Sequence, residues 1–328
     1  MPVPHHQMTT AASRLTFCIL SVLFCAGRVM AAGVHYYVFF GQERERITEP
    51  SFLQSNFEGA QLKYVWRELE PQKDHYNFQD IQHDLAFLQS RGKKLFIQIQ
   101  DASFDVNIRP FPRYLVEDPA YHGGADKQYG EDNAPYGWMA RRWDTAVRER
   151  FQRLLLALGQ EFDGRIEGIN LPESAFDVAS DQRLWPKGFT PETYCDGIIA
   201  NMMALKRAFP KSVTLQYANF MPGDKKYLEK VYQQAETLQV GVGGPDLLPY
   251  KYFQMENSYP LIRQYAGLVP TGIAVQDGNY EHKNPKTGKQ VTIAELVSFA
   301  TEYLKVDYIF WCTQEPFYSQ RVIPFVGH

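Results

Sequence analysis

Short runs of apolar and β-branched residues alternate along the chain with segments whose apolar positions recur at helical spacing. This alternation predicts an α/β protein with a parallel sheet built from βα units. Eight such runs are present, and eight parallel strands can close into a (β/α)8 TIM barrel that has no open edge. An open, doubly wound sheet would produce much the same pattern. The predicted strands span residues 34–40, 62–66, 95–99, 166–171, 213–217, 240–243, 272–276 and 308–311.

The segments between the strands carry helix start signals. Thr190 and Pro191 place a capping hydroxyl before a proline at the first helical position, and Pro210 marks the end of that helix. Thr292 and Glu295 form a capping-box pattern. Another helix is indicated by apolar positions at helical spacing, which put one face toward a sheet; these are Val147, Phe151, Leu154, Leu155 and Leu158.

A single domain is the economical interpretation, because such barrels need about 250 residues plus loops. We expect an export signal over residues 1–31, where Arg14 precedes an apolar run that is short for a membrane span. Residues 32–328 would then form the barrel, which is expected to be secreted or periplasmic. The segment of about 101–143 has little periodicity and follows a predicted strand end, so we expect a long loop over the active face.

The predicted second βα unit has a distinctive sequence. It contains Tyr64-Val65-Trp66-Arg67-Glu68-Leu69-Glu70-Pro71, then Tyr76-Asn77-Phe78, and leads to the strand at Phe96-Ile97-Gln98-Ile99-Gln100. This unit resembles the second unit of the retaining (β/α)8-barrel glycoside hydrolases, nearest to the family-42 β-galactosidases. The resemblance covers about a tenth of the chain. It implies a glycoside hydrolase whose two carboxyl groups flank the scissile bond.

The resemblance also implies positions for those carboxyl groups. The general acid/base of that clan is a glutamate just after the fourth strand, which corresponds here to Glu173. The family has an adjacent Asn-Glu pair, whereas Leu171 and Pro172 separate Asn170 from Glu173 in this chain. The nucleophile of the clan is a glutamate at the end of strand seven, where this chain has no glutamate. The candidates for the second carboxylate are Asp277, Glu281 and Glu315.

Other polar and aromatic side chains at predicted strand ends are candidates for binding sugar hydroxyls and ring faces. Trp311, at the end of strand eight, resembles the aromatic floor of the clan's cleavage subsite. Asp246 is a further candidate that could also be a simple turn residue. The remaining predicted substrate-binding residues are Trp66, Arg67, Glu68, Gln98, Gln100, Asn170, Tyr217 and Asn219.

Composition limits the other possibilities. The formal charge of -3 provides no electrostatic footprint for nucleic acid or anionic lipid. The sequence has no HExxH, phosphate-loop or GxSxG motif, so we expect no metal and no cofactor. Cys195 and Cys312 could pair, but the sequence does not decide this. Two alternatives stay open: a glycan-binding barrel of the cell envelope that does not cleave its ligand, and a barrel enzyme acting on another substrate.

Overall fold

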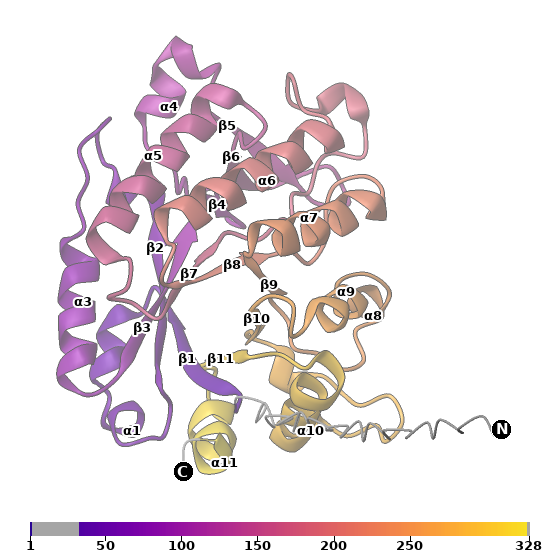
Figure 1. Ribbon diagram of the computed structural model, residues 1–328. Coiled ribbons are helices and arrows are strands. Elements are labelled where there is room, and N and C mark those ends of the chain that lie inside the picture. The colour runs from indigo at the N-terminus through magenta and orange to yellow at the C-terminus, as the bar shows by residue number, and fades with distance from the viewer. Residues whose placement is uncertain (2–32, 327–328) are drawn as a thin grey trace. The chain divides into compact units, whose positions relative to one another are not determined.

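The computed structural model describes Met1 and residues 33–326. The predicted export signal and its cleavage point lie outside these described residues. The eight predicted runs all form strands of one closed, parallel barrel, which confirms the TIM-barrel prediction (Figure 1). Around the barrel the strands follow the order β1, β2, β3, β7, β8, β9, β10 and β11, and β11 pairs with β1 to close the ring. Their bounds are β1 His35–Gly41, β2 Gly59–Val65, β3 Lys94–Gln100, β7 Gly168–Leu171, β8 Val213–Tyr217, β9 Gly241–Gly244, β10 Thr271–Val275 and β11 Tyr308–Cys312.

Helices connect successive strands, and α6 packs against both α5 and α7 on the outside of the barrel. The α-helices are α1 Pro50–Leu53, α2 Trp66–Leu69, α3 Gln79–Ser90, α4 Tyr114–Glu117, α5 Thr145–Phe162, α6 Pro191–Ala208, α7 Lys225–Leu238, α8 Tyr252–Glu256, α9 Ser258–Tyr265, α10 Ile293–Ser298 and α11 Ile323–Val326. Short 3-10 or π segments are η1 Arg44–Thr48, η2 Pro119–Tyr121, η3 Gln182–Leu184, η4 Asn279–Glu281, η5 Phe299–Leu304 and η6 Tyr318–Val322.

The predicted helix signals are confirmed where the structure tests them. The side chain of Thr190 caps α6 by accepting from the backbone N–H of Thr193, and Pro191 occupies the first turn. Thr292 and Glu295 form a reciprocal capping box at the start of α10. The five apolar residues predicted to share one helix face all lie buried on α5.

The segment between β3 and α5 is more regular than predicted. Instead of an irregular loop it contains a three-stranded antiparallel sheet, which we call the insertion sheet, with strands β4 Ala102–Ser103, β5 Ala125–Tyr129 and β6 Pro135–Ala140. Gly137 allows β4 and β6 to approach closely, because a Cβ there would lie 2.1 Å from the carbonyl oxygen of Ser103. The alternation of apolar and polar residues that identifies a strand is difficult to recognise in a short strand flanked by turn residues.

Two separate apolar layers hold the barrel together. Inward-facing rings fill its interior, among them Tyr37, Phe96 and Phe310, and their centroids lie 5.0–6.1 Å apart. The larger layer lies between the strands and the surrounding helices. Both faces of every strand are therefore covered, as expected for a parallel sheet.

The Trp66-to-Pro71 sequence that prompted the family resemblance has a structural role in this layer. Trp66 is fully buried and edges against Phe151 of α5 at 5.1 Å between ring centroids. Its indole Nε1 donates to Glu70 at 2.9 Å, and the buried Glu70 carboxylate also pairs with Arg150 of α5. Glu70 thus fixes the chain after β2 to the helix that follows the insertion sheet.

We predict that Glu70→Ala lowers the free energy of unfolding by about 3 kcal/mol, because it removes the buried carboxylate that binds Arg150 and Trp66 and leaves the exposed Asp74 as the remaining ion-pair partner of Arg150. Glu68→Ala is the matched control, since Glu68 is exposed two residues away and its loss should change stability by less than about 0.5 kcal/mol. Urea unfolding followed by circular dichroism measures both. Equal stability of the two variants would contradict the role assigned to Glu70.

Candidate active site

A polar cavity of about 250 Å³, which we call the mouth cavity, is lined by residues at the carboxyl-terminal ends of β1, β2, β10 and β11. Active sites of TIM barrels form at this end, because the loops that follow the strands meet there. Three charged side chains lie in its wall: Glu43 after β1, Lys63 on β2 and Asp277 after β10. The cavity is lined by Phe39, Phe40, Gly41, Glu43, Lys63, Gln276, Asp277, Cys312 and Thr313.

Glu173 lies two residues beyond β7, at the same end of the barrel. Its Oε2 accepts a hydrogen bond of 2.9 Å from the Nδ2 of Asn219, which follows β8. The next residue, Ser174, donates its backbone N–H to the carbonyl of Tyr217 at 2.8 Å and its hydroxyl to the carbonyl of Phe220. These contacts along the end of β8 fix the direction in which the Glu173 carboxyl group points.

A buried ion pair holds the backbone of Glu173 from the other side. Arg142 forms a two-pronged pair with Asp101, with N–O distances of 2.5 and 2.9 Å, and both side chains are almost fully buried. The third arm of the guanidinium donates to the Glu173 carbonyl at 2.6 Å and to the Tyr194 hydroxyl at 2.9 Å. Asp101 directly follows β3, so this pair joins the ends of β3 and β7.

Burial raises the pKa of Glu173 to about 7. The desolvated environment disfavours the ionised carboxylate, and the negative charge of Asp246 adds to the rise. The Asn219 amide and the positive charges of Lys63 and Arg142 act in the opposite direction. Near neutral pH a substantial fraction of Glu173 therefore keeps its proton, as a general acid requires.

Lys63 brings a positive charge to the barrel mouth. It follows Gln61 by two positions on β2 and therefore faces the barrel interior. Its Nζ lies 5.5 Å from the ring centroid of Phe39, and no ion pair joins it to any residue that the structure describes. Burial lowers the pKa of the Lys63 ammonium, and the nearby Glu173 carboxylate opposes this shift.

The candidates for the second carboxylate occupy different environments. Asp277 is exposed and lines the cavity that Lys63 also lines. Glu281 is exposed and accepts from Gln314 at 2.7 Å, whereas Glu315 is exposed and accepts from the hydroxyl of Ser319 at 2.6 Å. Neither glutamate is among the residues lining the mouth cavity. Of the three candidates for the second carboxylate, Asp277 is therefore the one that lines the same cavity as Lys63, whose charge acts on Glu173.

Asp246, which follows β9, is also close enough to influence Glu173. Its carboxylate is held by Lys251 at 2.8 Å and by the amide of Asn279 at 3.0 Å. Its backbone is left-handed, with a φ of 66°. These contacts hold the Asp246 side chain in place at the end of β9.

Several predicted binding residues meet inside the barrel below the mouth. Gln61 donates to Asn170 at 2.9 Å and to the hydroxyl of Tyr217 at 3.2 Å, so Asn170 and Tyr217 are engaged in a buried network. The Oε1 of Gln98 and the Oδ1 of Asn219 are buried acceptors without a donor among the described residues. Buried acceptors need donors. Sugar hydroxyl groups are donors of the required kind.

The remaining predicted binding residues are placed differently. Gln100 donates to the carbonyl of Ala102 at 2.5 Å. Arg67 is half-buried and Glu68 is exposed, both on α2 after the end of β2.

The structure corrects the expected sugar-stacking role of the two tryptophans. Trp66 and Trp311 have no exposed surface and belong to the layer between strands and helices. Trp311 alternates with Phe310 on β11, and Phe310 is the residue that faces the barrel interior. A shift of one residue along a strand moves a side chain from the inner face of the barrel to the outer face. The family resemblance alone could not decide on which face Trp311 lies.

The sequence analysis did not identify Lys63, Arg142 and Tyr136 as residues near Glu173, nor Gln61 as the residue that binds Asn170 and Tyr217. The polar alternation of Gln61 and Lys63 along β2 was a usable signal, because two polar residues on one face of a barrel strand require an interior partner. Arg142 and Tyr136 lie in the insertion segment, where the sequence carried no comparable signal. Their positions depend on tertiary contacts with Asp101 and Asp177.

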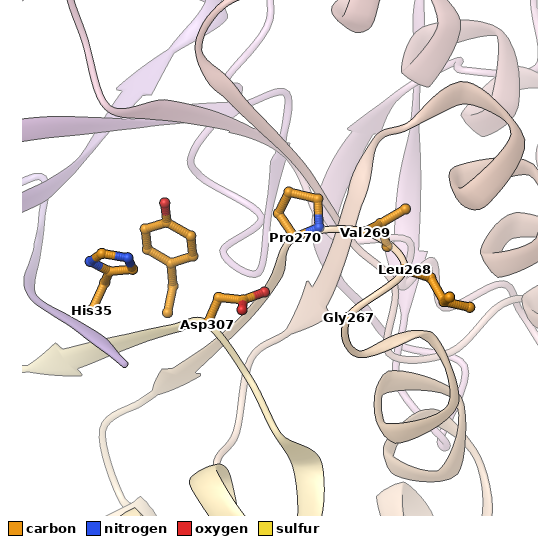
Figure 2. Close-up of a pocket in the computed structure, with 7 residues that line it drawn as sticks. His35, Gly267, Leu268, Val269, Pro270 and Asp307 are labelled. Atoms are coloured by element: carbon orange, nitrogen blue, oxygen red, sulfur yellow. The ribbon is translucent and has the colours of Figure 1, made fainter. Parts of the chain in front are cut away.

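A second pocket, of about 370 Å³, lies at the opposite end of the barrel (Figure 2). His35, Pro270 and Asp307 line it at the amino-terminal ends of β1, β10 and β11. Nearby charges are paired with one another, since His35 contacts Glu58 at 2.6 Å and Lys94 bridges Glu58 and Glu167. Paired charges at the amino-terminal end of the strands contribute to barrel stability, so we place the candidate chemistry at the other end.

Within the described part of the chain, no three His, Cys, Asp or Glu side chains are grouped so that they could hold a metal ion. Cys195 and Cys312 are both buried, free thiols. Among residues 33–326 we find no helix with the length and apolarity needed to cross a bilayer.

Comparisons with solved structures relate the fold to known proteins. The β-galactosidase of Rahnella sp. R3 superimposes with a TM-score of 0.54 at 11% identity, covering 85% of this chain and 50% of that one. The catalytic domain of β-amylase from Paenibacillus polymyxa gives a TM-score of 0.57 at 10% identity and covers 86% and 92% of the two chains. A thermostable mutant of a xylanase from Cellvibrio japonicus gives 0.50 at 14% identity, covering 86% and 87%.

These likenesses confirm the expected resemblance to glycoside hydrolase barrels, β-galactosidases among them, at the level of the fold. The chain spans about half the length of the β-galactosidase that it matches. No protein-family model and no curated protein sequence matches the chain. A shared fold does not fix function, which depends on the residues of the site.

We predict that the stability of Glu173→Gln relative to wild type increases as the pH rises from about 4.5 to 7 and is constant above that range. The folded-state pKa of about 7 lies above the ordinary value of 4.5. Between these values the folded protein binds more protons than the unfolded one, so wild-type stability falls with rising pH. Because glutamine cannot ionise, the stability of Glu173→Gln does not fall with pH for this reason.

Thermal unfolding at several pH values measures this difference. Leu156→Ala removes an exposed apolar side chain and no titratable group, so its offset from wild type should not vary with pH. A Glu173→Gln offset that is equally flat would show that the carboxyl group has no raised pKa.

We further predict that Lys63→Met raises the pKa of Glu173 above about 7, since it removes a positive charge that favours the carboxylate. The titration of the Glu173 carboxyl carbon by NMR reports the shift, with Glu173→Gln identifying the signal. Lys289→Met changes the net charge equally at an exposed site and serves as the control. An unchanged or lowered pKa in Lys63→Met would refute the coupling.

Proposed function

We propose that this protein is a glycoside hydrolase that cleaves O-glycosidic bonds of an oligo- or polysaccharide. The observation that carries the proposal is Glu173, a carboxyl group with a pKa of about 7 after the fourth barrel strand, oriented by Asn219. The fold shared with β-galactosidase, β-amylase and xylanase structures supports it. Unsatisfied acceptors on Gln98 and Asn219 supply partners for sugar hydroxyl groups.

In this mechanism Glu173 donates its proton to the glycosidic oxygen as the bond to the anomeric carbon breaks. The departing sugar then leaves as a neutral alcohol. Glu173 becomes a carboxylate next to Lys63, whose positive charge stabilises it. Lys63 thus favours the state that follows proton transfer, while burial keeps the proton in place before it.

We propose Asp277 as the second carboxylate, because it lines the mouth cavity together with Lys63. Its ionised side chain would attack the anomeric carbon or activate a water molecule there. Asp246 would act as the fixed negative charge that raises the pKa of the acid.

A second candidate function is a barrel that binds a glycan without cleaving it. It is favoured by the end of β10, where the chain presents Asp277 and no glutamate. Such a protein would keep the side-chain amides that bind sugar hydroxyl groups. The wild type would then hydrolyse no glycan, and Glu173→Gln would bind glycans with the same affinity as the wild type.

We also propose that the protein is secreted or periplasmic. The basis is the sequence of residues 1–31, in which a basic residue precedes a short apolar run and small residues follow. Amino-terminal sequencing of the protein from the cell envelope or medium tests this. A chain that still begins at Met1 would refute cleavage.

The catalytic proposal predicts that Glu173→Gln and Asp277→Asn each lower kcat by at least about 100-fold on a substrate that the wild type cleaves. A panel of 4-nitrophenyl glycosides and soluble polysaccharides identifies that substrate. Wild-type activity should fall as the pH rises through about 7, because the acid form of Glu173 is consumed.

Glu281→Gln and Glu315→Gln are matched controls that should retain activity within a few fold. Undiminished hydrolysis by Glu173→Gln would remove the acid assignment. A loss confined to Glu281→Gln or Glu315→Gln would transfer the role of the second carboxylate to that residue.

A further inference from the structure

Two stacked aromatic rings, one exposed and one half-buried, lie at the insertion sheet. Phe104 follows β4 and is 52% exposed, and Tyr136 on β6 lies nearly parallel to it, with 6.1 Å between ring centroids and an interplanar angle of 10°. Together they form what we call the first platform. Trp138 on the same strand is not part of it, because Arg109 and Lys127 already contact its ring at 4.7 and 5.7 Å.

The first platform is fixed next to Glu173. The hydroxyl of Tyr136 donates to the carboxylate of Asp177, four residues beyond Glu173, and the backbone N–H of Tyr129 donates to the Asp177 carbonyl at 2.9 Å. Asp177 and Glu173 both contribute to raising the pKa of Tyr136, after burial itself. The ring of Tyr136 is therefore within electrostatic range of the proposed acid.

A second aromatic group follows the next strands of the ring. Phe220 comes directly after Asn219, the residue that binds Glu173, and its ring meets that of Phe253 edge-on at 5.7 Å. Phe253 is 51% exposed, and the adjacent Tyr252 is more exposed still. We call Phe220, Tyr252 and Phe253 the second platform. It is anchored by α8, whose Glu256 carbonyl accepts from Lys225 at the start of α7.

The strand order decides where the two platforms lie relative to the acid. The strands β3, β7, β8 and β9 are consecutive neighbours in the barrel. The first platform follows β3, Glu173 follows β7, and the second platform follows β8 and β9. In the order of strands around the barrel, Glu173 therefore lies between the two platforms.

We propose that the two platforms bind successive sugar rings on both sides of the scissile bond, so that the protein accepts internal segments of a glycan chain. The apolar face of a pyranose matches an aromatic ring, and the hydroxyl of Tyr136 with the Asp177 carboxylate adds polar partners at the edge. This inference rests on the proposed function and extends it to endo-acting cleavage.

The test measures binding without cleavage. In a Glu173→Gln background, calorimetry follows hexasaccharides and disaccharides of β-1,4-linked glucose, xylose, galactose and N-acetylglucosamine. For the hexasaccharide bound best, Phe104→Ala and Phe253→Ala should each weaken affinity by about tenfold, the effect of losing one stacking contact. Tyr136→Phe keeps the ring and should retain most of the affinity.

Phe325→Ala is the matched control, because Phe325 is 52% exposed on α11, outside the loops that form either platform. It should leave affinity unchanged. A weakened hexasaccharide in only one of the two platform variants would overturn endo binding in favour of one-sided binding. No binding by any hexasaccharide, or equal affinity in all variants, would overturn the glycan assignment and leave the platforms to a protein partner.

Failure of this inference is distinguishable from failure of the proposed function. If the wild type cleaves a substrate but neither platform variant changes hexasaccharide affinity, the hydrolase stands and the platforms do not bind glycan. If both platforms bind and the wild type cleaves nothing, the glycan-binding alternative stands and the platform assignment survives. Internal cleavage of an end-labelled hexasaccharide by the wild type completes the test.

Discussion

The buried ion pair between Asp101 and Arg142 is the interaction on which the proposed site depends. It joins the end of β3 to the start of α5 and, through the third arm of the guanidinium, holds the carbonyl of Glu173. Two buried charges are tolerated because they neutralise each other and their remaining hydrogen-bonding groups are satisfied. The result is a rigid backbone at the point where the fourth barrel strand delivers its carboxyl group.

Rigidity at this point permits the opposing electrostatics around the carboxyl group. Burial and Asp246 favour the protonated form of Glu173, while Asn219, Lys63 and Arg142 favour the ionised form, and the pKa of about 7 results from their balance. A mobile side chain would relax toward solvent and recover a pKa near its ordinary value. Burial also disfavours the charged form of Lys63 and therefore lowers the pKa of its ammonium group. The Glu173 carboxylate opposes this shift, because its negative charge favours the charged form of Lys63.

The insertion sheet adds to the barrel what its strands do not provide. The strands place charged and amide groups around the mouth, whereas Trp66 at the start of α2 and Trp311 on β11 lie in the outer layer. The exposed rings come instead from the segment after β3 and from the loops after β8 and β9. This division is consistent with a barrel that fixes the acid while its loops determine which ligand reaches it.

The sequence by itself determined the eight strands, their parallel arrangement, the helix caps at Thr190 and Thr292, and the position of Glu173 after the fourth strand. These features depend on local patterns: apolar residues alternate in strands and recur every three to four residues in helices. Such patterns can be recognised in a single sequence. The tertiary structure alone decided which way Trp311 faces, that the segment after β3 forms a sheet, and that Arg142 approaches Glu173. Each of those outcomes depends on contacts between residues distant in the chain or on a register shift of one residue, and no local pattern encodes them.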